Sequence, residues 1–190
     1  LRLLDSLSPE GGPAQLGILL CLYTGIRLGE ACGLRWGDVP EGRYIIYIRR
    51  TLQRLPVQDG SGKTALVFGP PKSASSARAI PVPASLRDRL DELRRDDSCY
   101  VLTGTDAPME PRRFQRQFKS ALRAAGVQDI NFHALRHTFA TNCVSLGCDA
   151  ATLARLLGHS DVAVTLNTYV HPSFEAMRDI VDKNSARFAS

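Results

Sequence analysis

The chain lacks the features of a disulfide-built, zinc-binding or membrane-spanning protein. Its five cysteines are an odd number and contain no CxxC pair, which argues against a disulfide framework or a zinc cluster and favours a reducing compartment. No apolar run approaches the roughly 18 residues that a membrane-spanning helix needs, and the N-terminus has no basic-then-apolar signal pattern. We therefore expect a soluble protein of the cytoplasm.

Size and charge narrow the class further. A chain of 190 residues with 44% hydrophobic side chains favours one well-packed domain over two. The formal charge of +5 favours an anionic partner without identifying it, since ribosomal, membrane-surface and DNA-binding proteins share this property. The chain opens with LRLLDSLSPE rather than with Met, which suggests a piece of a larger protein.

Apolar periodicity predicts helices along most of the chain, with glycine or proline near their ends. Residues 13–24 are apolar enough for a buried helix, and Gly25 follows where a left-handed cap belongs. Further helices are expected at 28–34, 84–95, 111–125, about 132–146, 150–157, 162–169 and 173–188.

The strands of a sheet are predicted between residues 43 and 82, and a further short strand or extended piece is expected at 100–102. Residues 43–55 are rich in β-branched and aromatic side chains, and the DGSGK turn follows them. Strands at 65–68 and 78–82 would complete a small antiparallel sheet, with Lys72 at or near a hairpin tip. The fold class is mainly α with a small antiparallel β-sheet (α+β).

The segment HALRHTFATNCVSL carries the first candidate functional residues. An apolar stripe of Leu135, Phe139, Cys143 and Leu146 recurs at helical spacing, and His133 and Arg136 share a face beside it. Taken alone, this pattern is explained as well by a structural role as by a functional one: the histidine could be a core residue, and the arginine could pair with an internal carboxylate.

Two other positions point to phosphate chemistry. Arg27 lies between two apolar segments, where an unpaired guanidinium is costly to bury, so it is expected to meet an anion. Tyr169 stands ten positions after His159 in LLGHSDVAVTLNTY, a spacing that by itself would occur by chance in many proteins. A tyrosine served by positive and hydrogen-bonding side chains suggests a nucleophile aimed at phosphate.

With these segments in order, nearly the whole chain resembles the tyrosine recombinase (phage integrase) family, most of all integrases of phages or conjugative transposons. TGIRLGEACGLRWGDV resembles the first arginine box and PPKSASSARAIPVP the β-hairpin lysine segment. HALRHTFAT resembles the His-x-x-Arg box, and LLGHSDVAVTLNTY the final histidine and nucleophilic tyrosine. The resemblance implies the catalytic set Arg27, Lys72, His133, Arg136, His159 and Tyr169, with Glu30 at the acidic position that supports the arginine box.

Physical chemistry makes these implied roles sensible. A free tyrosine has a pKa of about 10, so near pH 7 only about one phenol in a thousand is ionised, a shortfall of roughly 4 kcal/mol. His133 is the candidate base, and Arg27, Arg136 and His159 can donate to the non-bridging phosphate oxygens. Lys72 would protonate the leaving 5′ oxygen, as the resemblance implies.

The implied activity is site-specific breakage and rejoining of double-stranded DNA through a covalent 3′-phosphotyrosine, without metal, ATP or any other cofactor. Residues 1–171 would form the catalytic domain. Residues 172–190 would form a helical tail that docks on a neighbouring protomer of a dimer to tetramer on DNA. The core-binding domain that precedes this domain in the family is absent from these residues, and a bacterial, nucleoid-associated location is expected.

Three weaker signals have simpler explanations. His133 and His137 have the spacing of two metal ligands, but HALRH lacks the glutamate of the HExxH motif. GSGKT resembles the end of a phosphate-binding loop, yet Val57 occupies the earlier position at which that loop requires glycine. Basic clusters on the first strand and on the helix after Pro111 could contact phosphates or only face solvent; they comprise Arg49, Arg50 and Arg54, and Arg112, Arg113, Arg116 and Lys119.

Two rival functions share much of this pattern. A type IB topoisomerase would use the same residues to nick and reseal one strand as a monomer, whereas a recombinase should need paired sites and several protomers. A DNA-binding module that had lost catalysis would act by occupancy and leave no covalent adduct. The intact set of active residues argues against this second rival.

Overall fold

The computed structural model describes residues 3, 7, 11–57, 62–71, 76–169, 174, 175, 178 and 181. Its helices include α2 (Pro13–Thr24), α3 (Leu28–Cys32), α4 (Arg87–Leu93), α5 (Pro111–Ala124), α6 (Ala134–Ser145), α7 (Ala150–Leu157) and α8 (Val162–Tyr169). Short 3-10 turns lie at Trp36–Asp38 and Ala84–Leu86. No helix in this described part has the length and apolar character needed to cross a bilayer.

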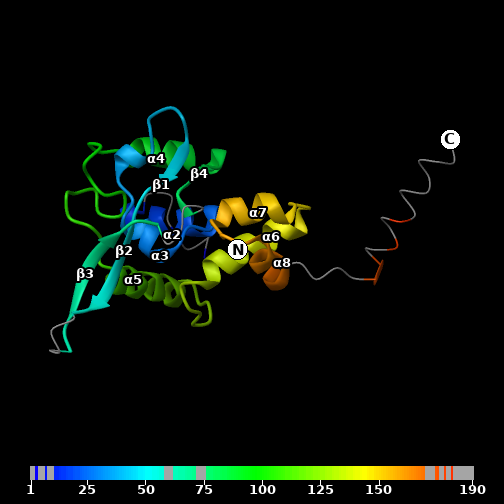
Figure 1. The fold of residues 1–190 in the computed structure, drawn as a ribbon. Helices are drawn as coiled ribbons and strands as arrows, with labels where there is room; N and C mark the ends of the chain where they lie inside the picture. The colour runs from blue at the N-terminus through cyan, green and yellow to red at the C-terminus, as the bar shows by residue number, and fades with distance from the viewer. Residues whose placement is uncertain are drawn as a thin grey trace.

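Helix α2 lies at the centre of the domain, with α5 and α6 packed against it (Figure 1). It is apolar on all sides, as expected for a helix surrounded by other elements. Helix α5, in contrast, buries Phe114, Phe118 and Leu122 at successive turns and leaves its polar side outward. Both helices contribute to the main core, which also takes in buried side chains of α3, α4, β1, β2 and β4.

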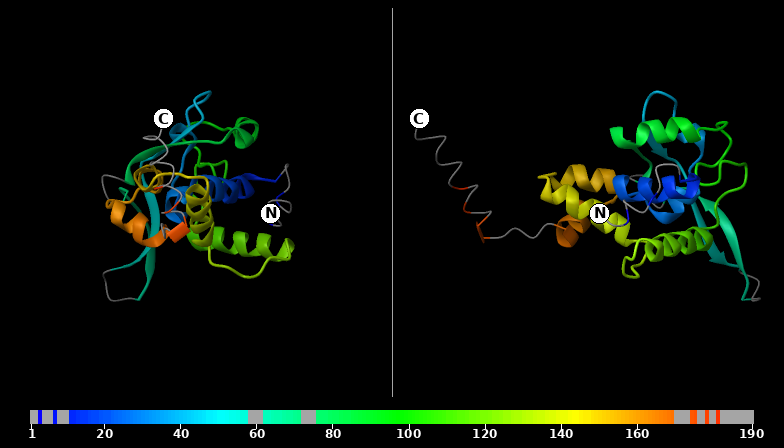
Figure 2. Two further views of the ribbon diagram at one scale, coloured as in Figure 1. Left: turned by 90° about the vertical axis from the view of Figure 1, so that its right-hand side faces the viewer. Right: turned by 180° about the vertical axis from the view of Figure 1, so that it is seen from behind.

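A smaller cluster lies between α6, α7 and α8, beside the main core. Ala140, Leu153 and Leu157 are fully buried there, and Phe139 and Tyr169 pack on them. These three helices lie together on one side of the molecule in the views of Figures 1 and 2. The nucleophile proposed from the sequence is thus held against a core of its own.

The strands form two separate two-stranded sheets, so the expected single sheet is wrong. β1 (Ile45–Ile48) pairs antiparallel with β4 (Arg78–Pro81), and β2 (Thr51–Pro56) pairs antiparallel with β3 (Thr64–Gly69). The strand predicted over 43–55 is interrupted at Arg49 and Arg50, whose guanidinium groups pair with the buried Asp38 carboxylate. β1 and β4 cover the core, whereas the β2–β3 ribbon projects away from α6, α7 and α8 (Figure 1).

Most predicted helices are confirmed, and the differences lie at their ends. Helix α3 ends at Cys32 rather than at residue 34, and 84–95 divides into a 3-10 turn and α4. Residues 100–102 contribute only a bridge between Arg35 and Tyr100. Leu146 follows α6 with 85% of its surface exposed, so it does not extend the buried stripe.

Gly25 ends α2 in the left-handed conformation, with φ of 65°. A Cβ atom there would lie 2.5 Å from Cδ1 of Phe139 on α6. We predict that Gly25→Ala lowers the free energy of unfolding by about 2–5 kcal/mol, because left-handed backbone strain adds to overpacking against the ring. Urea unfolding measures the change.

Gly42 is the matched control for this substitution, since its φ is 68° and its Cβ would meet nothing within 4 Å. Gly42→Ala should cost only the backbone strain, about 1–2 kcal/mol. Equal losses for the two variants would show that the Phe139 contact is not a constraint.

Candidate active site

The site is built around the C-terminal end of α7. Gly158 takes the left-handed conformation with φ of 66°, and the His159 amide returns to the Ala154 carbonyl at 3.0 Å. This Schellman-type ending leaves the last carbonyl groups of the helix pointing outward, where the helix dipole favours positive charge. A side chain at Gly158 would meet the Arg78 guanidinium at 2.8 Å, so the close approach also requires glycine.

Three arginines from distant parts of the chain donate to three successive carbonyls at this end. Arg78 Nε lies 2.7 Å from the Leu156 oxygen, Arg136 Nη2 lies 2.7 Å from the Leu157 oxygen, and Arg27 Nη2 lies 3.2 Å from the Gly158 oxygen. Arg136 also donates to the Gly25 carbonyl at 2.7 Å, which ties α6 to the end of α2. The helix end therefore gathers three guanidinium groups in a small volume.

Glu30 supplies the negative charge in this cluster. Its two carboxylate oxygens each accept from Arg78 at 3.0 Å, and they also accept the Arg27 side chain at 2.9 Å and backbone amide at 2.8 Å. Burial opposes ionisation of Glu30, yet the bonds from Arg78 and then Arg27 outweigh it and lower the pKa. Arg27 thus meets the anion expected from its sequence context.

His159 joins the cluster through Arg136, whose Nη2 lies 3.0 Å from His159 Nε2. Because a guanidinium nitrogen can only donate, Nε2 accepts and the proton lies on Nδ1. Nδ1 then donates to the buried Thr165 hydroxyl at 2.8 Å. His159 is therefore neutral here, in agreement with a pKa lowered to about 4 by burial and by the charges of Arg136, Arg27 and Arg78.

A pocket of about 290 Å³ opens beside these groups. Arg27, His133 and Arg136 line it together with Gln115 and Asn131. Burial and then the charge of Arg27 lower the Arg136 pKa to about 10, so the group stays cationic at neutral pH. The pocket wall thus combines two guanidinium groups with a histidine, which is a suitable environment for a phosphodiester.

Tyr169 ends α8 with its hydroxyl 3.0 Å from Nδ1 of His137. His137 follows His133 by one helical turn, and the two imidazole rings meet edge to face with centroids 4.7 Å apart. Burial raises the Tyr169 pKa, and the charge of Arg136 offsets part of that rise. Since the phenol is harder to ionise than a free tyrosine, an adjacent proton acceptor matters more.

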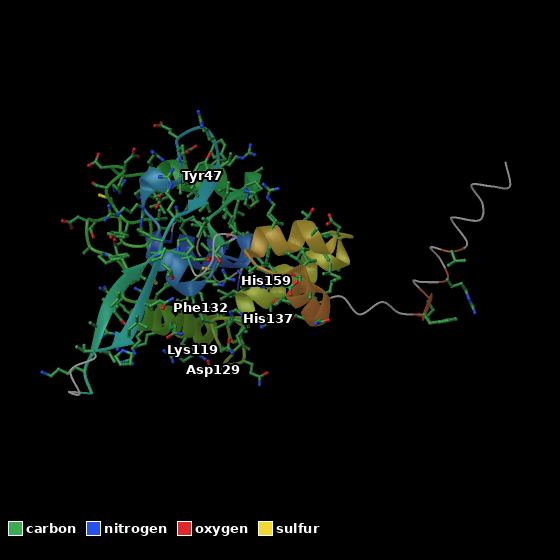
Figure 3. The ribbon with its side chains drawn as sticks, in the orientation of Figure 1. Tyr47, Lys119, Asp129, Phe132, His137 and His159 are labelled. Atoms are coloured by element: carbon green, nitrogen blue, oxygen red, sulfur yellow. The ribbon has the colours of Figure 1, made fainter. Side chains whose placement is uncertain are left out.

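The structure places the basic residues of α5 on two flanks of the helix. Gln115 reaches the pocket, and Arg112 before it and Arg116 and Lys119 after it lie at helical spacing on the same side. Arg113 lies on the other flank and lines a separate pocket near the start of α2. Lys119 pairs with Asp129 at the edge of the molecule, as Figure 3 shows.

The first-strand arginines have partners within the domain. Arg49 and Arg50 pair with Asp38, and Arg54 pairs with Glu110. These contacts favour a structural role over phosphate binding. Lys72 and most of the predicted tail lie outside the described residues.

Residues 2–176 match the model of the phage integrase family. The chain belongs to this family. The match covers all the segments that build the site, from the Arg27 turn to the end of α8. The catalytic domain of a tyrosine recombinase is therefore the fold that holds this arginine cluster.

Relatives and solved structures agree with this assignment. The domain is 31% identical over 172 residues to a "Tyrosine recombinase XerC-like" protein of Caldanaerobacter subterraneus subsp. tengcongensis, over 80% of this chain and 44% of that protein. It resembles the crystal structure of the XerA recombinase with a TM-score of 0.65 and 26% identity, over 96% and 61% of the two chains. It resembles the Tn1549 transposon integrase in complex with transposon right end DNA with a TM-score of 0.72 and 24% identity, over 91% and 59%. The integrase domain thus spans about half the length of these relatives.

Arg78 and Thr165 of the integrase domain escaped the sequence analysis, and His137 entered it only as a rejected metal ligand. Arg78 and Ile80 share the buried face of β4. An arginine at an inward-facing strand position was the sequence signal that could have identified Arg78. His137 is one turn from His133, and Thr165 is one turn before Tyr169. Helical spacing identifies both as neighbours of site residues, but it does not show what they contact.

Acid titration tests the buried, neutral state of His159. Its folded pKa of about 4 lies below the unfolded value of about 6.5, so the unfolded chain alone takes up a proton between these values. The free energy of unfolding of the integrase domain should therefore fall as the pH is lowered through this window. Urea midpoints at a series of pH values measure the trend.

His159→Gln should flatten this dependence, since the amide oxygen can still accept from Arg136 but cannot titrate. The remaining slope would come from His133, whose pKa is lowered first by burial and then by His137 and Arg136. Glu30, with its pKa below the ordinary range, loses its contribution only at more acidic pH. An undiminished slope in His159→Gln would contradict the assignment.

Proposed function

We propose that this chain is the strand-transferring part of a site-specific DNA recombinase, of the type that integrates and excises mobile DNA. Tyr169 attacks a phosphodiester, forms a 3′-phosphotyrosine and releases a 5′ hydroxyl, and the hydroxyl of another strand reverses the step. The observation that carries the proposal is the arginine cluster at the end of α7, which borders the pocket of Arg27, His133 and Arg136.

Charge stabilisation is the main task of the cluster in this reaction. Negative charge grows on the non-bridging oxygens in the phosphoryl transition state, and each preorganised donor can contribute about a hundredfold to a thousandfold in rate. Arg27 and Arg136 are held by backbone carbonyls at one end and face the pocket at the other. Lys72 would protonate the leaving 5′ oxygen, as the family resemblance implies.

The proposed partners are double-stranded recombination sites and further copies of the chain. The lambda integrase has been crystallised as a dimer bound to a COC' core site, and the XerH recombinase bound to its difH substrate. Here Phe174 and Val181 of the tail are 69% and 65% exposed, which supports docking of the tail on a neighbouring protomer. A core-binding domain that precedes this one, as the family resemblance implies, would provide further contacts to DNA.

Covalent trapping on nicked duplexes tests the proposed function. A strand nicked just 3′ of the cleavage site loses its 5′-hydroxyl fragment after attack, so the phosphotyrosine cannot be reversed. We predict that the chain forms a denaturant-resistant adduct from a library of nicked duplexes with randomised sequence, and that Tyr169→Phe forms none. Gel mobility detects the adduct, and sequencing of the trapped DNA identifies the preferred target.

Three outcomes separate the rival functions. A catalytically silent DNA-binding module would give no adduct for the unsubstituted chain. A type IB topoisomerase would relax supercoiled plasmids without paired sites, whereas a recombinase would exchange strands between two copies of the recovered target. Adduct formation by Tyr169→Phe would move the nucleophile to another residue.

We further propose that Arg112, Arg116 and Lys119 on α5 contact DNA phosphates. They lie on the same flank of the helix as Gln115, which lines the pocket, so a duplex seated on the site would pass along this flank. Replacing all three by Gln should reduce the slope of log affinity against log salt by about 2–3, since each phosphate contact contributes about 0.9. Fluorescence anisotropy at several salt concentrations measures this slope.

Arg113 provides the control on the same helix, because it lies on the other flank beside the second pocket. Arg113→Gln should change the slope less than Arg112→Gln does. Equal effects of these single variants would favour a general electrostatic contribution over contacts along one flank.

A further inference from the structure

The hydroxyl of Tyr169 is hydrogen-bonded to His137, a histidine that the sequence analysis did not place in the catalytic set. It lies 3.0 Å from His137 Nδ1, within the range that proton transfer between a phenol and an imidazole requires. The two ring centroids are 5.7 Å apart at an interplanar angle of 54°. His137 therefore meets the reacting oxygen of the proposed nucleophile directly.

His133, the base expected from the sequence, lies in a different position. It lines the pocket with Arg27 and Arg136, where the phosphate would sit. The His133 ring contacts the His137 ring edge to face, so His137 lies between His133 and the Tyr169 phenol. The geometry divides the two histidines between the phosphate and the nucleophile.

We propose that His137 is a catalytic residue that accepts the Tyr169 proton. This inference rests on the proposed recombinase function and assigns the proton acceptor within it. As the phenol oxygen forms its bond to phosphorus, the O–H bond breaks and the proton moves to His137 Nδ1. The bond from phosphorus to the 5′ oxygen breaks, and that oxygen takes a proton from Lys72 or from water.

The same contact serves the reverse step. When a 5′ hydroxyl attacks the phosphotyrosine, the phenol becomes the leaving group, and protonated His137 can return a proton to its oxygen. His137 is exposed, so it can also exchange this proton with solvent between the two steps. Forward and reverse strand transfer thus need only one residue at the phenol.

The test compares His137→Asn with His133→Asn in single-turnover cleavage of the duplex recovered by trapping. The Asn side chain can still hydrogen-bond near the position of Nδ1, but it cannot take up a proton. His137→Asn is expected to slow cleavage about 10²-fold to 10⁴-fold. Each variant is then combined with 3,5-difluorotyrosine at position 169, whose phenol ionises more readily than that of tyrosine.

Rescue by difluorotyrosine distinguishes proton transfer from positioning. The more acidic phenol should restore at least tenfold of the rate in His137→Asn, and it should restore much less in His133→Asn, whose defect lies at the phosphate. The fluorine NMR signal of residue 169 and the urea midpoint confirm that each variant is folded. His137→Gln serves as a second substitution if the Asn variant does not fold.

Three results would overturn the inference. Cleavage by His137→Asn at the unsubstituted rate or faster would mean that the contact only holds the phenol in the absence of DNA and takes no part in the reaction. A slow His137→Asn without rescue would reduce His137 to a positioning residue, and rescue confined to His133→Asn would restore His133 as the acceptor. Absence of any adduct with the unsubstituted chain would instead reject the proposed function itself.

Discussion

The constraint on which this site depends is the crowding of three guanidinium groups at one helix end. Arg27 and Arg78 pair with one carboxylate, that of Glu30, while Arg136 bonds to backbone carbonyls and to His159, so the three arginines and Glu30 together carry a net charge of +2. Carbonyl dipoles at the end of α7 offset part of the repulsion, because their negative ends point at the cations. The remaining charge suits a phosphodiester with one negative charge and suits even better a transition state in which more charge accumulates.

This arrangement explains why the site needs the whole domain. Arg27 lies between α2 and α3, Arg78 begins β4, and Arg136 lies on α6, so three separate segments must converge on α7. Burying a guanidinium without a partner is costly, and removing one partner of a buried ion pair typically lowers the free energy of unfolding by about 3–5 kcal/mol. The contacts that stabilise the fold therefore also set the distances between the phosphate-binding groups. Folding and preorganisation of the site are one process here.

Sequence patterns predicted the parts of this domain whose determinants are local. Pro13 and Gly25 mark the ends of α2, and the apolar spacing of α7 and α8 gave their bounds correctly. The strand over 43–55 was predicted as continuous, because the pairing of Arg49 and Arg50 with the buried Asp38 cannot be read from the composition of the strand itself. Arg78 was missed for the same reason, since its partners Glu30 and Leu156 come together only in the folded chain.

The proposed nucleophile and the proposed phosphate-binding groups are connected through α8. Thr165 lies one turn before Tyr169, and its hydroxyl accepts from His159 Nδ1 while His159 Nε2 accepts from Arg136. A phosphate oxygen that approaches Nε2 requires a proton there, which leaves Nδ1 as an acceptor for the neutral imidazole. A hydroxyl can then reverse its role and donate, so the bond to α8 survives either tautomer. Thr165, which links α8 to His159, can therefore keep this hydrogen bond whether the proposed phosphate site is empty or filled.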